Sequence, residues 1–130
     1  MTLKTAEITG VLDDQPIKLT IQAATVLTGM KRAILAERAR TRVAELGLAA
    51  GAGAGDVAVL LLANYTYPDL VAATVAAAGL DVDGLTLDAF LELPQEFVDA
   101  WLVGVYALCP HWAPGRKPET AEAEAAEKNG

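Results

Sequence analysis

The chain has one cysteine, Cys109, and one histidine, His111, among its 130 residues. A single cysteine excludes a disulfide within the chain, which fits a reducing compartment. These two residues alone cannot supply the three or four ligands of a zinc site, and a Cys-His nucleophile pair also needs a third, orienting group. We therefore predict no catalytic residue, no metal site and no cofactor, and we expect a protein that is not an enzyme.

Long hydrophobic runs are also missing. The longest, residues 57–63, is far shorter than the roughly 20 residues needed to cross a bilayer. Residues 1–20 alternate between polar and apolar side chains and carry charge, which is unlike a secretory signal. We therefore expect a soluble cytoplasmic protein with no membrane partner.

Positive charge is scarce: 10 Lys and Arg stand against 17 Asp and Glu, giving a net charge of -7. Nucleic acid is excluded as the main partner because phosphate binding needs a dominant basic face. All formal charges in residues 56–110 are negative, whereas residues 31–42 carry five basic side chains. Such a chain can attract copies of itself, so we expect a homo-oligomer; the alternative is two ordinary solvated faces.

Hydrophobic residues make up 53% of the chain, and the many alanines among them indicate closely packed helices. At the N-terminus the pattern is instead that of strands. Residues 3–12 alternate, Asp13 to Pro16 form a turn, and Ile17, Leu19 and Ile21 alternate again. We predict a β-hairpin over residues 1–21.

Helical spacing begins after Gln22. The apolar side of a predicted helix comprises Val26, Leu27, Met30 and Ile34, and Val43 and Leu46 continue it less strictly. The polar side carries the arginines, and Gly47 suits the end of the helix. Residues 48–55 are rich in alanine and glycine and predict a flexible linker.

Further helices are predicted in the second half of the chain. Residues 57–63 predict a short buried helix, and Tyr67-Pro68-Asp69 starts a helix ending at Gly79. The inner face of that second helix is expected to comprise Leu70, Val71, Thr74, Val75 and Ala78. Thr86 can cap a following helix, and Pro94 begins the clearest amphipathic helix, which Pro110 stops.

Together these patterns predict a mainly α fold: an N-terminal β-hairpin followed by a bundle of about four to five helices. Residues 1–112 form a single domain, and residues 113–130 lack an apolar face and predict a disordered tail.

Five stretches within residues 3–112 carry a family resemblance. The first is the transition from hairpin to long helix at Leu19 to Gln22, and the others are Tyr67 to Ala72, Leu87 to Pro94, Phe97 to Trp101 and Ala107 to Trp112. Their order resembles that in the tail assembly chaperones of long-tailed bacteriophages and prophages. The resemblance implies a chaperone that binds the tape measure protein and keeps it soluble during tail assembly in the host cytoplasm. It further implies self-association and absence from the mature virion.

Other partners implied by the resemblance are the tail tube protein and a frameshift-extended form of the chain itself. Glu127-Lys128-Asn129 can be encoded by a slippery heptamer, which reading the gene would settle. For protein binding we select first the side of the helix that carries Arg32, Arg38 and Arg42. Exposed members of the region 87–101 come next, chosen from Leu87, Phe90, Leu91 and Trp101.

Two other functions stay open. One is a structural tail or head–tail component that remains in the particle, and the other is an unrelated helical adaptor for protein–protein interaction. Mass spectrometry of purified particles would separate a retained component from a departing chaperone.

Overall fold

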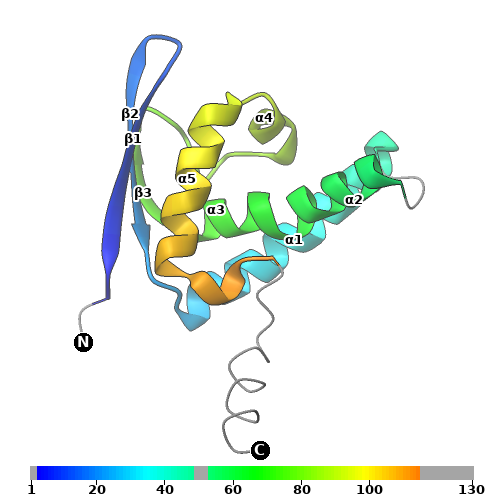
Figure 1. Cartoon of the computed structure of the whole chain (residues 1–130), viewed down its shortest axis with the longest axis horizontal. Coiled ribbons are helices and arrows are strands. Elements are labelled where there is room, and N and C mark those ends of the chain that lie inside the picture. The colour runs from blue at the N-terminus through cyan, green and yellow to red at the C-terminus, as the bar shows by residue number, and fades with distance from the viewer. Residues whose placement is uncertain (1–2, 49–52, 115–130) are drawn as a thin grey trace, which may run out of the picture.

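The computed structural model describes residues 3–48 and 53–114 (Figure 1). Half of the predicted linker, residues 49–52, and nearly all of the predicted C-terminal tail, residues 115–130, lie outside the described residues. The linker prediction is wrong for residues 54–55, which already belong to a helix. Within the described part, the predicted mainly helical fold with an N-terminal β-hairpin is confirmed, with one further strand completing a sheet.

The hairpin consists of β1 (Thr5–Leu12) and β2 (Gln15–Gln22), paired antiparallel with Thr5 opposite Gln22 and Leu12 opposite Gln15. The alternation buries Ile17, Leu19 and Ile21 and leaves the polar face exposed. Two residues, Asp13 and Asp14, make the turn, with φ of 49° and 64°. Left-handed φ at both central residues matches the twist of the strands that such a short turn connects.

The turn is a point of local strain because aspartate tolerates left-handed φ less well than glycine. Asp14→Gly should raise the free energy of unfolding by roughly 0.5–1 kcal/mol in chemical denaturation. Asp83→Gly is the matched control, because Asp83 is exposed and lacks a positive φ. Equal stabilisation by both changes would contradict this explanation.

The third strand, β3 (Thr74–Ala78), pairs antiparallel with β2 and gives the sheet order β1-β2-β3. The predicted helix from Tyr67 to Gly79 is therefore wrong beyond Ala73, where α3 (Tyr67–Ala73) ends. Pairing with β2 supplies the backbone hydrogen bonds that a longer helix would have made. Gly79 follows with φ of 87°, and a Cβ there would lie 2.5 Å from the Pro16 carbonyl oxygen.

One face of the sheet is covered by α5 (Gln95–Leu108), as Figure 1 shows. The predicted amphipathic pattern is confirmed: Phe97, Trp101 and Val105 are buried, and Cys109 follows them into the core. The helix approaches β1 so closely that a Cβ at Gly104 would collide with the Ile8 side chain. Helix and sheet therefore share one core.

Two short elements flank α5. Before it lies α4 (Leu87–Leu91), where the Thr86 hydroxyl accepts a hydrogen bond from the Ala89 amide at 3.2 Å, confirming the predicted cap. After it, Pro110 opens the 3-10 turn η2 (Pro110–Trp112), which returns the buried Trp112 to the core. Cys109 is buried, and burial raises the pKa of its thiol, which disfavours the reactive thiolate.

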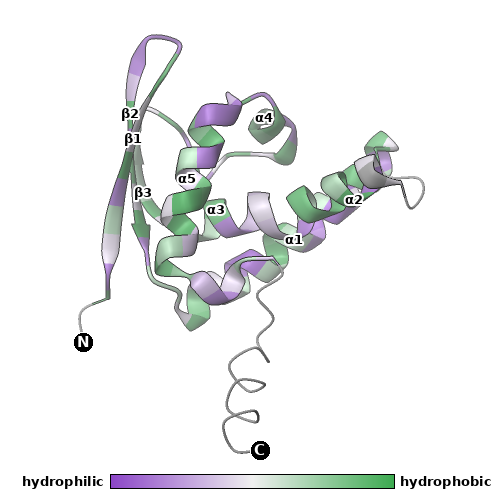
Figure 2. Ribbon diagram, in the orientation of Figure 1, coloured by the Kyte–Doolittle hydropathy of each residue, from purple (hydrophilic) through white to green (hydrophobic). Residues whose placement is uncertain are grey.

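The remaining helices run alongside one another and extend away from the sheet (Figure 1). They are α1 (Val26–Leu46), α2 (Ala54–Leu61) and the π-helical turn η1 (Leu62–Thr66), which leads into α3. The prediction of a buried helix over residues 57–63 is wrong for its first part, because Val57, Leu60 and Leu61 are exposed. Figure 2 shows α2 largely in the hydrophobic colour. None of the helices in the described ranges is long and apolar enough to cross a membrane.

Candidate protein-binding surface

The long helix α1 starts and ends at residues suited to those positions. Its N-terminal cap is reciprocal: the Thr25 hydroxyl accepts from the Thr28 amide at 3.1 Å, and the Thr28 hydroxyl accepts from the Thr25 amide at 2.8 Å. At the other end Gly47 adopts φ of 66°, and its amide donates to the Ala44 and Val43 carbonyl oxygens. These caps satisfy backbone groups that would otherwise lack partners. They stabilise the helix independently of which face packs inward.

Of the apolar residues predicted for α1, only Val43 packs inward. Thr28, Ala36, Ala39 and Val43 are buried, and this side of the helix lies against α3. The first four apolar residues predicted from the sequence point instead to solvent: Val26 is 84% exposed, Leu27 62%, Met30 59% and Ile34 51%. Small alanines on the inner face let α3 approach closely, which larger side chains would prevent.

We refer to Val26, Leu27, Met30 and Ile34 as the outer stripe. The four residues lie on one side of the first turns of α1 and extend about 12 Å along its axis at 1.5 Å per residue. A single exposed leucine is ordinary, but several neighbouring large apolar side chains indicate an interaction surface. The outer stripe is therefore the leading candidate for contact with another molecule.

A buried polar cluster fixes the opposite side of α1. Asp69 is fully buried in α3, where Arg32 Nε donates to its Oδ1 and the Tyr106 hydroxyl donates to its Oδ2 at 2.6 Å. The Arg32 guanidinium also donates to the Trp112 carbonyl oxygen at 3.3 Å, and it lies 5.0 Å from the centre of the Trp112 indole ring. One arginine thereby joins α1 to α3 and η2, and its carboxylate partner extends the cluster to α5.

Burial dominates the electrostatics of this cluster. It raises the pKa of the Asp69 carboxyl above its ordinary value, although the hydrogen bonds from Arg32 and Tyr106 act in the opposite direction. Burial and the hydrogen bond to Asp69 raise the pKa of the Tyr106 phenol, so it remains a proton donor. From the sequence, Asp69 is only an acid in the first turn of a helix, and no local pattern links it to Arg32.

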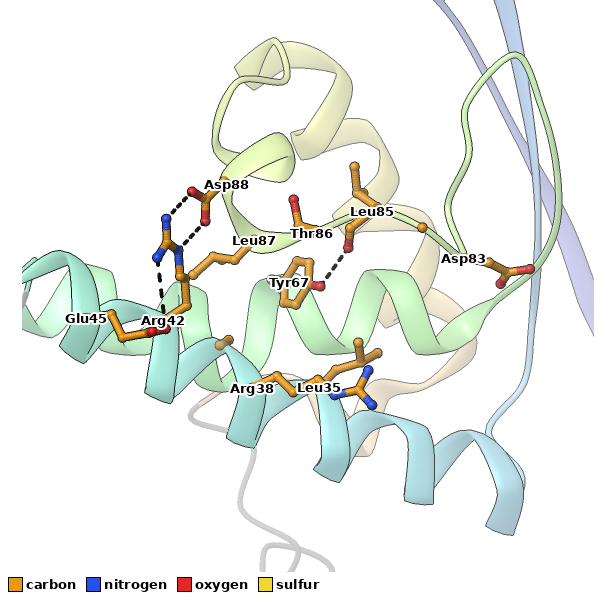
Figure 3. Close-up of a pocket in the computed structure, with 12 residues that line it drawn as sticks. Leu35, Arg38, Arg42, Glu45, Tyr67, Asp83, Leu85, Thr86, Leu87 and Asp88 are labelled. Atoms are coloured by element: carbon orange, nitrogen blue, oxygen red, sulfur yellow. Dashed lines mark hydrogen bonds and ion pairs between the residues drawn. The ribbon is translucent and has the colours of Figure 1, made fainter.

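A cleft of about 560 Å³ lies between α1 and residues 83–88 (Figure 3). Leu35 and Arg38 from α1 line it on one side, and Tyr67 lies between them and Leu85. The Tyr67 hydroxyl donates to the Leu85 carbonyl oxygen at 2.7 Å, and burial raises the pKa of Tyr67. The cleft is thus partly apolar inside and is bordered by charged side chains.

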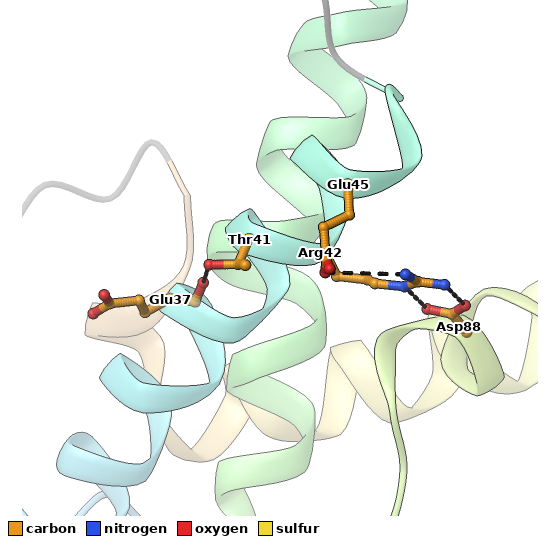
Figure 4. A network of polar contacts seen from close by, with 5 residues as sticks. All are labelled: Glu37, Thr41, Arg42, Glu45 and Asp88. Atoms are coloured by element: carbon orange, nitrogen blue, oxygen red, sulfur yellow. Dashed lines mark hydrogen bonds and ion pairs between the residues drawn. The ribbon is translucent and has the colours of Figure 1, made fainter.

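An ion pair closes one end of this cleft. Arg42 donates from Nε and Nη2 to the two Asp88 carboxylate oxygens at 2.8 and 2.7 Å, and its Nη1 lies 3.9 Å from Glu45 (Figure 4). The Arg42 guanidinium holds the pKa of the Asp88 carboxyl below its usual range. In the same view the Glu37 carboxylate points away from this pair. Arg42 is therefore already occupied by partners from its own chain.

A second groove, of about 250 Å³, connects the cleft to the outer stripe. Ile34 belongs to both the groove and the stripe, whereas Leu35, Arg38 and Asp83 line both the groove and the cleft. Lys31 and Val71 complete the groove. Apolar surface therefore continues from the first turns of α1 around the helix toward α3.

The residues selected from the sequence fall into different environments. Arg32 and Arg42 are held by Asp69 and Asp88, whereas Arg38 is exposed beside the groove. The remaining candidates divide by burial: Leu91 is exposed, but the core contains Leu87, Phe90 and Trp101. Phe90 and Trp101 are enclosed in the core and are unavailable to a partner in this structure, whereas Leu87 is buried but lines the cleft. We assign none of the three a binding role.

The sequence identifies the outer stripe as the apolar side of the helix, but its local pattern does not show whether that side is buried. The other side of α1 carries Ala36 and Ala39 at helical spacing, a less hydrophobic but flatter surface on which a neighbouring helix can pack closely. Within residues 3–48 and 53–114, no group of three or more Asp, Glu, His or Cys side chains is arranged to hold a metal ion. No protein-family model, curated protein or solved structure matches this chain.

Proposed function

We propose that this protein binds another polypeptide through the outer stripe of α1 and acts as a phage tail assembly chaperone. Its client would be the tape measure protein, kept soluble in the host cytoplasm until the tail is built. The observation that supports binding is the exposure of four large apolar side chains on one face of a well-capped helix. Covering them with a partner contributes about 1–2 kcal/mol per side chain.

The geometry of the stripe suits a helical client. Leu27, Met30 and Ile34 recur at the spacing with which an amphipathic helix contacts a partner's apolar face or groove. Methionine adapts its shape to different neighbours, which suits a chaperone that meets many segments of one long protein. The phage assignment itself comes from the resemblance of the sequence.

Self-association remains part of the proposal, with the basic first half of one copy facing the acidic second half of another. A retained tail component is the second candidate. The two differ in particle content: the chaperone should be absent from purified virions, and the structural component should be present in stoichiometric amount.

The stripe is tested with Met30→Glu combined with Ile34→Glu. Two carboxylates in the contact should weaken binding to fragments of the neighbouring tape measure protein by at least about 100-fold, because apolar burial is lost and charge is desolvated. Binding is measured by calorimetry, and client solubility by co-expression.

The matched control is Thr41→Glu combined with Ala44→Glu, two exposed positions further along the same helix. It adds the same charge and should leave binding nearly unchanged. Circular dichroism should show native helicity in both variants. Wild-type protein that binds no tape measure fragment would falsify the proposed function. An equal loss of affinity in both double variants would show that the outer stripe is not the binding surface.

A further inference from the structure

Among the residues that the structure describes, two cations beside the outer stripe have no ion-pair or hydrogen-bond partner for their side chains, unlike the other basic residues of α1. Arg32 is paired with Asp69, Arg42 with Asp88, and Arg40 donates to the Asn64 side chain at 2.7 Å. Lys31 and Arg38 are exposed and form no ion pair with any residue in the described ranges. Their charge is therefore available to another molecule.

The two cations are placed on one side of α1. They are seven residues apart, which is two helical turns or about 10.5 Å along the axis. Both line the groove of about 250 Å³, together with the apolar side chains of Ile34, Leu35 and Val71. Asp83 lines the groove as well, which leaves it one net positive charge.

We propose that this groove binds an amphipathic client helix that carries two carboxylates about two turns apart, beside its apolar residues. The inference rests on the proposed function and names the chemistry of the segment recognised. Apolar client side chains pack on Ile34, Leu35 and Val71, while the carboxylates pair with Lys31 and Arg38. The apolar contacts supply most of the affinity, and the ion pairs select which segment binds and in which position.

The occupant is a peptide segment rather than nucleic acid for an electrostatic reason. A net charge of -7 repels a phosphate backbone, whereas a segment with two carboxylates meets its opposite charges locally. The apolar floor between the cations also matches leucine or valine side chains better than phosphates.

The experiment uses the full chain and two synthetic helical peptides. Both carry leucines at helical spacing; one has glutamates seven residues apart beside the leucines, and the other has lysines there. Fluorescence anisotropy should show the wild type binding the glutamate peptide about 3- to 10-fold more tightly than the lysine peptide, with the difference shrinking in high salt. Lys31→Glu combined with Arg38→Glu should reverse this preference.

The matched control for net charge is Lys4→Glu combined with Lys18→Glu, which changes the same number of charges in β2 and just before β1. It should keep the wild-type preference. The groove does not select the peptide if reversing the charges at residues 31 and 38 leaves the peptide preference unchanged. The same conclusion follows if both double variants shift the preference equally. The proposed function would survive that result, because it depends on binding of tape measure fragments and on the Met30 and Ile34 changes.

Other occupants give distinct results. Analytical ultracentrifugation compares the oligomeric state of the wild type with that of the Lys31→Glu, Arg38→Glu variant. If the wild type is an oligomer, the variant is a monomer and the peptide preference is unchanged, a second copy occupies the groove and the inference is overturned. If replacing Glu122, Glu124 and Glu127 with glutamine strengthens peptide binding, the chain's own C-terminal residues occupy it, which equally overturns the inference. Binding of an oligonucleotide more tightly than either peptide would also contradict it.

Discussion

Asp69→Ala lowers the free energy of unfolding by about 3–5 kcal/mol, because it leaves one partner of a buried ion pair uncompensated. Arg32 would lose the carboxylate that its Nε contacts, and the Tyr106 hydroxyl would lose its acceptor. Tyr106 is half-buried and the Arg32 side chain is 27% exposed, with the Tyr65 and Trp112 rings centred 5.8 and 5.0 Å from its guanidinium carbon. The loss is measured by urea denaturation followed by circular dichroism.

The control for this prediction is Asp88→Ala, which also removes an arginine–carboxylate pair but at an exposed position. Exposed ion pairs contribute little to stability, so the urea denaturation midpoint of Asp88→Ala should lie close to that of the wild type. A double-mutant cycle with Arg32→Met would isolate the coupling between the buried partners. Equal small effects of Asp69→Ala and Asp88→Ala would show that Asp69 does not carry its charge in the folded protein.

The position of Asp69 also explains how α1 is oriented. The helix has apolar residues on two opposite sides, the outer stripe and the alanine face, so hydrophobicity alone does not choose which one packs inward. Arg32 lies on the alanine side, and its pairing with Asp69 is satisfied only when that side faces α3. We infer that this ion pair contributes specificity of orientation and thereby keeps the outer stripe exposed.

Trp101→Ala is the second change with a large expected effect, because it should lower the free energy of unfolding by about 3–5 kcal/mol. The side chain is fully buried, with its ring 6.2 Å from that of Phe90 and 5.9 Å from that of Phe97. Its indole nitrogen donates to the Thr74 hydroxyl at 2.9 Å, and that hydroxyl donates to the Leu70 carbonyl oxygen at 2.7 Å. Removing the indole therefore creates a cavity where α5, β3 and α3 meet.

Val103→Ala on the same helix is the control, since Val103 is largely exposed and its loss should stay within about 0.5 kcal/mol. Thr74→Val tests the hydrogen bond separately. It keeps the shape but leaves the indole nitrogen unpaired, at a cost of about 1–3 kcal/mol. The denaturation midpoint should be highest for Val103→Ala, lower for Thr74→Val and lowest for Trp101→Ala. A different order would contradict the packing described.

Features encoded within a few residues of one another could be predicted from the sequence. Alternation fixed both strands of the hairpin, the Thr86 side chain predicted a cap, and Pro94 together with the spacing of Phe97 and Trp101 predicted α5. Each depends on backbone geometry and local hydrogen bonding, which neighbouring residues largely determine. The mainly helical class and the hairpin follow from these local signals alone.

Only the tertiary structure decided which apolar surface is buried. Residues 74–78 become a strand because β2 offers its edge, and α1 turns its alanine face inward because α3 brings Asp69 to Arg32. Those partners lie 37 residues or more away along the chain, so no period in the local sequence records them. The outer stripe is therefore apolar by sequence and exposed by tertiary packing, because burial depends on what the rest of the fold places opposite each face.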